Sequence, residues 1–379
     1  MAGSTYGTNF TITTWGESHG AAIGVVVDGC PAGLPLTEED IQSFLDRRKP
    51  GQGKFTTARK ETDKARILSG VFEGRTTGTP ISILIPNEDQ RSHDYGNIKD
   101  CYRPGHADYT FDTKYGFRDY RGGGRSSGRE TIGRVAAGAV ASKILAELGI
   151  HLQAYTCAIG DIKIPASEYH LEEISENALY MPSNIYAAKA ASYLEQRMKA
   201  CDSSGGIIEC RIDGMPVGIG EPVFHKLDAM LAGAVMSIGA VKGVEIGDGF
   251  LAAGSCGSKN NDPFYMKDGK PAKETNHSGG ILGGMSDGST ILLRAAIKPT
   301  PSIAQEQKTI TRDGDETTIT IHGRHDPVIV PRAVVVVESM VAITILDLLI
   351  HNMSAKLDNI RDFYPVSYTH LTLPTIYSV

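Results

Sequence analysis

A run of nine residues at positions 121–129, RGGGRSSGR, combines residue types that bind anions. Three consecutive glycines can expose successive backbone N–H groups, and the helix that we expect directly afterwards would point its positive end at the same place. Arg121, Arg125, Arg129 and, one turn later, Arg134 add fixed positive charge suited to phosphate. The spacing matches neither a P-loop nor a dinucleotide fingerprint. The run therefore predicts an anion site, with a flexible loop of solvated arginines as the alternative.

Three further segments concentrate charged residues at turns. Residues 47–54, RRKPGQGK, form a cationic loop stiffened by proline and glycine, or only a helix exit whose charge offsets the helix dipole. Residues 103–108, RPGHAD, set a histidine between an arginine and an aspartate after a Pro-Gly turn. Residues 323–327, GRHDP, follow an expected strand and join a cation, an imidazole and a carboxylate. Taken singly, each segment could be a structural turn.

The segment GESHG at 16–20 fits the nucleophile elbow of α/β-hydrolases, G-x-S-x-G. In those enzymes several strands and the oxyanion loop come before the elbow, whereas only 15 residues precede it here. A serine hydrolase that uses Ser18 is therefore a remote alternative. His19, beside glycines at a turn, is a candidate acid.

Composition excludes several classes of function. The 379 residues are 41% hydrophobic and 22% charged, and the net charge of -6 gives no global basic field for nucleic acid or an anionic membrane. Residues 47–66 hold a basic cluster, but Phe55 is the only aromatic residue among the charges, so nucleic-acid binding is disfavoured. Six widely spaced cysteines indicate reduced thiols of a cytosolic protein, and the start of the chain does not have the pattern of a signal peptide. The apolar stretch at 328–350 contains charged residues and is expected to be a buried helix rather than a membrane span.

The elements that must position these segments are strands in hairpin-like pairs with helices between them. Strands are expected at residues 21–28, 66–72, 80–85, 206–212, 243–246 and 290–297 and in a hairpin at 308–322. Helices are expected after Thr37, where Asp40 can complete a capping arrangement, and at 126–148, 186–199, 224–238 and 333–351. The glycine-rich stretches 87–125 and 279–288 are expected to be loops, the first a functional one because of its length. The pattern favours an α+β fold of layers with mostly antiparallel sheets, and we find no linker and no convincing repeat.

Residues 1–365 are expected to form a single catalytic domain, followed by a tail at 366–379 without helix or strand pattern. Residues 366–375 can be back-translated as GTC TCT TAT ACA CAT CTG ACG CTG CCG ACG, which matches one frame of a transposon-end sequencing adapter. We interpret the tail as non-native, a hypothesis that resequencing the locus would test.

Taken together and in order, these segments resemble the chorismate synthase family. The matching strings are GESHGAAIGVVVDGCPAG at 16–33, RPGHADYT at 103–110, RGGGRSSGRET at 121–131, SIGAVKGVEIGDGF at 237–250, NHSGGILGG at 276–284, KPTPSI at 298–303 and GRHDP at 323–327. The resemblance covers residues 5 to 364 with no missing block.

The resemblance implies an anti-1,4-elimination of phosphate from 5-enolpyruvylshikimate 3-phosphate to give chorismate, the last step of the shikimate pathway. The reaction is redox-neutral but needs reduced FMN, which supplies the hard chemistry while the protein supplies orientation and charge. The implied fold is a β-α-β sandwich with helices on the outside, assembled as a homotetramer in the cytoplasm. Because we see no added reductase domain, an external flavin reductase is the expected electron source. A catalytically impaired relative that still binds FMN is the alternative.

The resemblance also assigns roles by matching position. It implies His19 as a proton donor or charge stabiliser near the leaving phosphate, His106 near the flavin, and Asp326 as an aid to deprotonation. The expected ligands of substrate anions are Arg48, Lys54, Arg103 and Arg134, of which the first two are in some cases assigned to an NADP phosphate. The positions that match FMN contacts are Arg125, Ser126, Ser127, Gly239, Ala240, Gly283, Lys298, Pro299, Thr300, Pro301, Ser302 and Arg324. Pro301 stands where a serine is common and Lys54 where an arginine is frequent, and no metal ligand is expected.

Overall fold

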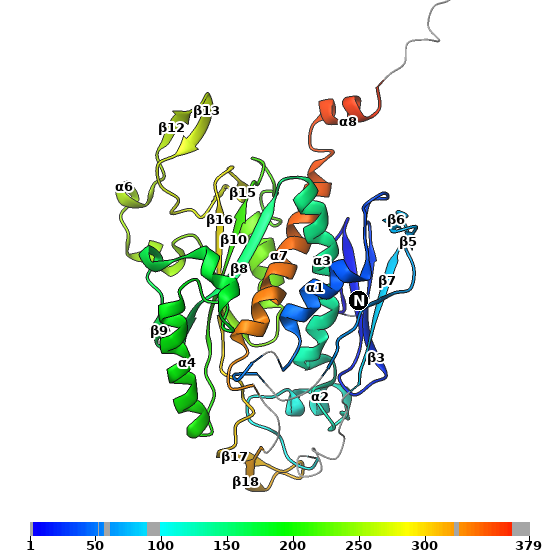
Figure 1. The fold of residues 1–379 in the computed structure, drawn as a ribbon, viewed down its shortest axis with the longest axis vertical. Helices are drawn as coiled ribbons and strands as arrows, with labels where there is room; N and C mark the ends of the chain where they lie inside the picture. The colour runs from blue at the N-terminus through cyan, green and yellow to red at the C-terminus, as the bar shows by residue number, and fades with distance from the viewer. Residues whose placement is uncertain (1–2, 52, 57–60, 89–98, 322–325, 366–379) are drawn as a thin grey trace, which may run out of the picture.

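The computed structural model describes residues 3–51, 53–56, 61–88, 99–321 and 326–365. Two five-stranded sheets lie on either side of a layer of helices (Figure 1). The first sheet has the order β1 (Thr5–Tyr6), β2 (Thr11–Gly16), β3 (Ala22–Asp28), β7 (Ile81–Pro86), β4 (Arg66–Ile67). The second has the order β11 (Val241–Ile246), β16 (Ile291–Ile297), β10 (Gly206–Asp213), β8 (His151–Ile159), β9 (Ile162–Lys163). Every strand pair in these two sheets is antiparallel, which confirms the predicted α+β class.

The two longest helices lie between the sheets. α3 (Thr131–Glu147) packs against β3 and β2, α7 (Val330–Asn352) packs against β8 and β10, and the two helices pack against each other. Their close contact depends on Gly138, where a Cβ would lie 2.2 Å from Cβ of Ser339. The expectation that the helices lie outside is therefore wrong for α3 and α7, because each uses small or apolar residues on all sides. α4 (Asn184–Lys199) does lie at the periphery, beside β9 (Figure 1).

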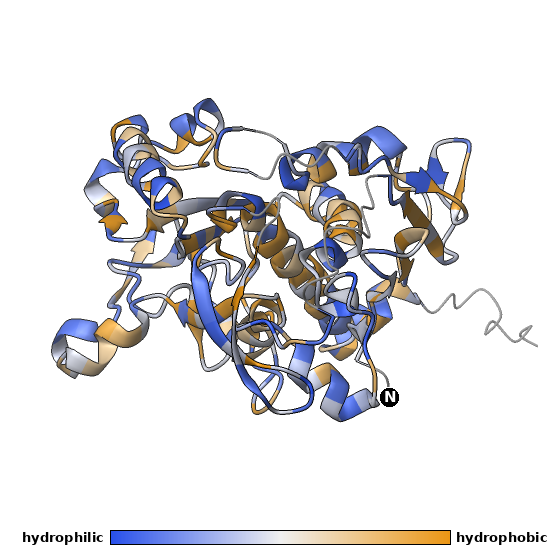
Figure 2. Ribbon diagram, turned by 90° about the horizontal axis from the view of Figure 1, so that it is seen from below, coloured by the Kyte–Doolittle hydropathy of each residue, from blue (hydrophilic) through white to orange (hydrophobic). Residues whose placement is uncertain are grey.

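α7 is the core of the molecule. It is long and apolar enough to cross a membrane, with a mean hydropathy of 2.4, but 83% of its most apolar window is buried inside the protein. Figure 2, seen from the lower end, shows hydrophobic helices in the centre with hydrophilic segments around them. The carboxylate of Asp347 accepts hydrogen bonds from the backbone N–H groups of Thr8, Asn9 and Phe10, so α7 also fixes the start of the chain. The prediction of a buried helix is confirmed.

The N-terminus of the helix after Thr37 lies where the sequence predicted, but that of α3 does not. α1 (Glu38–Arg48) begins after Thr37, whose side chain forms the predicted capping box with Asp40. α3 does not begin after Ser126 or Ser127, as predicted, because two short 3-10 turns come first. Ser127 instead caps the second of these turns.

Several loops contain more structure than the sequence indicated. The stretch 87–125 includes α2 (Asp108–Tyr115), and residues 66–72 form two short strands rather than one. The remaining elements are the hairpins β5 (Val71–Phe72) and β6 (Arg75–Thr76), β12 (Phe264–Lys267) and β13 (Lys270–Lys273), β14 (Ile281–Leu282) and β15 (Met285–Ser286), and β17 (Glu306–Ile310) and β18 (Glu316–Thr320), with the helices α5 (Leu227–Met236), α6 (Gly257–Asn260) and α8 (Leu357–Phe363).

The two halves of the chain repeat one plan. The order strand, helix, hairpin, strand, long helix holds for β3, α1, β5–β6, β7, α3 and again for β10, α5, β14–β15, β16, α7. The same hydrogen bond holds each hairpin: Thr76 Oγ1 donates to Pro31 O at 2.6 Å, and Ser286 Oγ donates to Pro216 O at 2.5 Å. The sequence did not reveal this repeat because matching positions carry different residues of similar character.

Candidate active site

Four helix ends meet at one end of the sandwich, the lower end in Figure 1. α1 and α5 end here, and α3 and α7 begin here. Arg48 Nε donates to Thr131 Oγ1 at 3.1 Å, Arg134 Nη1 donates to Ser237 Oγ at 2.6 Å, and Arg332 Nε donates to Arg48 O at 3.0 Å. The positive ends of α3 and α7 meet the negative ends of α1 and α5 here, so the local groups rather than the summed helix dipoles decide which charge a ligand can have.

The glycines of the run 121–129 form a concave turn directly before α3. Gly123 has φ -87° and ψ 2°, and Gly124 has φ +50°. A right-handed residue followed by a left-handed one directs successive N–H groups to one point, the geometry called an anion nest. Within the described part of the chain, the N–H groups of Gly123 and Gly124, which this geometry aligns, donate no hydrogen bond. The turn thus has a backbone geometry that fits the predicted anion site.

His19 lies directly against this turn. A Cβ on Gly122 would lie 2.4 Å from Nδ1 of His19, so the imidazole packs on the glycine itself. Nδ1 is also 3.1 Å from Ser18 Oγ. Ser18 stands between β2 and β3 of an antiparallel hairpin, not at the strand-to-helix turn of a nucleophile elbow, which removes the structural basis for a serine hydrolase.

Two arginines beneath the nest are buried scaffold residues. Arg48 is 2% exposed, and its Nη1 lies 2.7 Å from Asp63 Oδ2. Arg129 Nη2 lies 3.2 Å from the other oxygen of Asp63, and its Nη1 lies 3.3 Å from Glu61 Oε1. Burial lowers the pKa of Arg48 to about 9, although Asp63 opposes the shift. The donors of Arg48 are directed to protein groups, and its expected contact with a substrate anion stays a prediction.

The other expected anion ligands differ in accessibility. Arg103 is buried and forms a bidentate pair with Asp108, with both N–O distances 2.7 Å. Arg134 keeps 16% of its side chain exposed at the start of α3. Lys54 is the most accessible, with 64% of its side chain exposed and its Nζ 2.7 Å from Glu195 of α4. Of these residues, Arg134 and Lys54 are the more exposed, and their donors are also directed to protein groups, Glu130 and Ser237 in the case of Arg134.

Side chains of the run 121–129 stiffen the nest. Arg125 reaches back to β2, where its Nη1 donates to Gly16 O at 3.0 Å and its Nη2 to Thr14 Oγ1 at 2.6 Å. Ser126 Oγ donates to Gly123 O at 2.7 Å. These contacts fix the turn against the first sheet and leave its backbone available.

A second cluster surrounds His106 at the same end. His106 Nε2 lies 2.9 Å from Ser302 Oγ, and Lys298 Nζ donates to Gly105 O at 3.0 Å. Lys298 N donates to Ala240 O at 2.9 Å, which joins this cluster to the end of α5. The structure therefore brings the predicted segments 103–108, 237–240 and 298–302 together.

The backbone of 298–302 offers further room for a ligand. Pro299 is exposed, and Pro301 packs against Gly105. Thr300 accepts a hydrogen bond from Ser203 Oγ through its carbonyl, while its buried Oγ1 has no partner within the described residues. Gly239 has no atom within 4 Å of the position of a Cβ. An unpartnered hydroxyl, a lysine and open glycine backbone fit an anionic cofactor such as FMN.

Asp326, the third expected catalytic residue, lies just before the start of α7, beside Arg332. Its Oδ2 lies 2.6 Å from Arg332 Nη1, and its side chain is 10% exposed. Ser204 N donates to Pro327 O at 2.9 Å, which ties the segment to the start of β10. Arg324 lies outside the described residues.

Gly283 does not lie with the other expected FMN contacts. It belongs to the β14–β15 hairpin, and its neighbour Gly284 accepts a hydrogen bond from Leu227 N at the start of α5. The site lies beyond the other end of α5, and a helix of 10 residues rises roughly 15 Å. Gly283 therefore lies about the length of α5 away from the residues around Ser237, and its expected contact with FMN stays a prediction.

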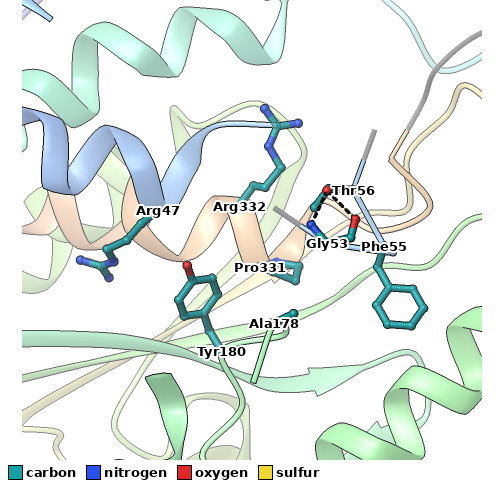
Figure 3. Close-up of a pocket in the computed structure, with 8 residues that line it drawn as sticks. All are labelled: Arg47, Gly53, Phe55, Thr56, Ala178, Tyr180, Pro331 and Arg332. Atoms are coloured by element: carbon teal, nitrogen blue, oxygen red, sulfur yellow. Dashed lines mark hydrogen bonds between the residues drawn. The ribbon is translucent and has the colours of Figure 1, made fainter. Parts of the chain in front are cut away.

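Two hollows lie near the site. The larger, about 520 Å³, is open and lies beside the loop that carries His19; it is lined by Trp15, Gly16, Glu17, Gly20, Ala21, Ala22, Leu84 and Arg125. The smaller, of about 10 Å³, is lined by Arg47, Gly53, Phe55, Thr56, Ala178, Tyr180, Pro331 and Arg332 (Figure 3). Figure 3 shows the guanidinium groups of Arg47 and Arg332 directed to different sides. The smaller hollow holds at most one water molecule, so only the larger one suits a ligand.

Sequence reasoning missed the carboxylates that hold the arginines. Asp63 and Glu61 pair with site arginines but do not stand out by local pattern, whereas Asp108 stands in the predicted segment 103–108 and only its pairing with Arg103 was not foreseen. Arg332 was noted only as an interruption of an apolar stretch, although a lone cation in the first turn of a buried helix is itself a signal.

Comparison with known proteins agrees with this geometry. The chorismate synthase family model matches residues 10–350. The chain is 64% identical over 364 residues to the chorismate synthase of Agathobacter rectalis, covering 96% of this chain and 99% of the relative. It is 63% identical over 365 residues to that of Lachnoclostridium phytofermentans, covering 96% and 100%. The fold is similar to a crystal structure of chorismate synthase, with a TM-score of 0.75 and 31% identity over 95% of this chain and 97% of that chain.

Proposed function

The chain belongs to the chorismate synthase family, lyases that eliminate phosphate from 5-enolpyruvylshikimate 3-phosphate, and we propose that it does so where α1, α3, α5 and α7 meet. The observation that carries this placement is the nest at Gly122–Gly124, which lies at the positive end of α3 with His19 against it. A leaving phosphate needs a site for its charge and a proton donor beside it, and this corner offers both.

Different residues of the chain bind the anionic group, donate a proton and assist proton removal. The nest N–H groups hold an anionic group, and His19 donates a proton or stabilises charge as phosphate departs. Asp326, held by Arg332 at 2.6 Å, is positioned to assist removal of the proton from the ring. Arg134 and Lys54 provide accessible positive charge, whereas Arg48 and Arg103 support the site from within.

Reduced FMN is the cofactor that this site would hold, and it would supply electron density to the substrate ring. Residues suited to hold it are Gly239, Lys298 and Thr300, because they combine open backbone, a positive charge and an unpartnered hydroxyl. His106 adjoins these residues and is placed to set the protonation of the bound flavin.

We also propose that the protein forms a homotetramer. The end opposite the site exposes large apolar side chains that the single chain does not cover: Val217, Val223, Phe224, Phe250, Leu251, Phe264 and Met266. Apolar surface on this scale suits contact with another copy. The six cysteines are all free, which suits a reducing cytoplasm, where an external flavin reductase would supply electrons.

The proposed site is tested by substitution of His19. We expect His19→Ala to lower kcat/KM at least about 100-fold in anaerobic phosphate release with chemically reduced FMN. His151→Ala is the matched control, since His151 is exposed at the other end of the molecule, at the start of β8. Equal loss in both variants, or no loss in His19→Ala, would reject the placement of the site.

A further inference from the structure

The hydrogen bonds around His106 determine which ring nitrogen carries a proton. Nδ1 lies 3.0 Å from the carbonyl oxygen of Pro104, and Nε2 lies 2.9 Å from Ser302 Oγ. A carbonyl oxygen only accepts, so Nδ1 must donate. In a neutral ring Nε2 then has no proton, and it accepts from the hydroxyl of Ser302.

The surroundings of His106 favour the neutral ring. Burial lowers the pKa of His106, and the nearby charges of Arg103 and Lys298 act in the same direction. Asp108 opposes them, but its carboxylate is already engaged in the bidentate pair with Arg103. Around neutral pH the ring is therefore an uncharged imidazole with its lone pair on Nε2.

Ser302 is held where it can direct that lone pair. It is 8% exposed. A Cβ on Gly105 would lie 2.8 Å from Pro301 Cβ, and Lys298 Nζ donates to Gly105 O, so the two loops are clamped on either side of the contact. The serine hydroxyl thus has little freedom to leave Nε2.

We propose that Ser302 is a positioning residue that acts through His106, by holding its imidazole in the Nδ1–H tautomer and directing the Nε2 lone pair. This goes beyond the match of Ser302 to an FMN-contact position, and it rests on the proposed role of His106 beside the cofactor. The hydroxyl donates to the unprotonated Nε2 of the neutral ring and can also turn to accept from Nε2–H of a charged ring, so its loss is read from the state of Nε2 in the neutral form.

The test is ¹⁵N NMR of histidine-labelled protein, with His106 assigned by comparison with His106→Gln. The wild-type protein should show the Nδ1–H tautomer, and a wild-type ring protonated on Nε2 alone would overturn the proposal even without variants. In Ser302→Ala the ¹⁵N resonance of the unprotonated Nε2 should move downfield at neutral pH, because the hydrogen bond from the hydroxyl is lost. Ser302→Thr keeps the hydroxyl and should give the wild-type resonance.

Catalysis gives a second readout. If His106 acts as proposed, kcat/KM should fall about 10-fold in Ser302→Ala and stay close to the wild-type value in Ser302→Thr. An unchanged Nε2 resonance in a folded Ser302→Ala protein contradicts the inference whatever the activity. A changed resonance with an unchanged kcat/KM supports the role of Ser302 but contradicts the proposed role of His106, so the two failures are distinguishable.

Discussion

Asp63 pairs with two buried arginines, Arg48 and Arg129. Its replacement by asparagine removes the negative charge but keeps the shape of the side chain, so it measures how much that charge contributes to the free energy of unfolding. The carboxylate is fully buried and lies 2.7 Å from Arg48 Nη1 and 3.2 Å from Arg129 Nη2. Its φ of +45° lies in the left-handed region, which asparagine tolerates, so Asp63→Asn changes charge without adding backbone strain.

The expected cost follows from which arginine loses its partner. Arg129 keeps Glu61 at 3.3 Å, but Arg48 is left with neutral acceptors only. Breaking one buried ion pair leaves an uncompensated charge and costs about 3–5 kcal/mol, a large share of the roughly 5–15 kcal/mol that stabilise a typical protein. The pKa of Arg48, lowered to about 9 by burial, is still high enough for the group to be charged at neutral pH.

The assay is urea denaturation followed by circular dichroism at neutral pH. Asp161→Asn, at an exposed turn, is the control and should change the free energy of unfolding by less than about 0.5 kcal/mol. A loss below about 1 kcal/mol in Asp63→Asn would refute the reasoning, because Arg48 would then have another source of compensation.

Two further substitutions test the site and the core. Gly122→Ala should push the ring of His19 aside and lower kcat by about 100-fold with little change in melting temperature. Gly128→Ala is the control and should retain activity, because a Cβ on Gly128 meets no atom within 4 Å. Equal rates of the two variants in steady-state assays would count against the packing of His19 on the nest. Asp347→Ala should destabilise the fold by about 3 kcal/mol in denaturant titration, since three backbone N–H groups lose their acceptor, and a neutral effect would mean that water replaces it.

The features that the sequence predicted well are those with local causes. The capping box of Thr37 and Asp40 depends on residues three apart, and the buried faces of β3 and β7 follow alternating or continuous apolar runs. Likewise, the nest was predictable because three glycines stand together before a helix.

The layer order could not be predicted in this way. Whether a helix lies inside or outside depends on what covers it, and α3 is covered by α7, which begins about 200 residues later. The small residue Gly138 permits that contact, but its partner Ser339 is visible only in the fold.

The site shows the same limit. The motif residues gather at one end, yet the roles of the arginines could not be inferred, because Asp63 and Glu61 are distant in sequence from Arg129. Gly283 also stands in a matching motif but lies at the far end of α5, so its expected contact with FMN stays a prediction.

The most direct test of the account is phosphate release from 5-enolpyruvylshikimate 3-phosphate under anaerobic conditions, with FMN reduced by dithionite. We predict that phosphate and chorismate form in equal amounts, only when the flavin is reduced, and without net oxidation of the flavin. Phosphate release with oxidised flavin alone, or none from a folded protein that binds FMN, would contradict the central claim.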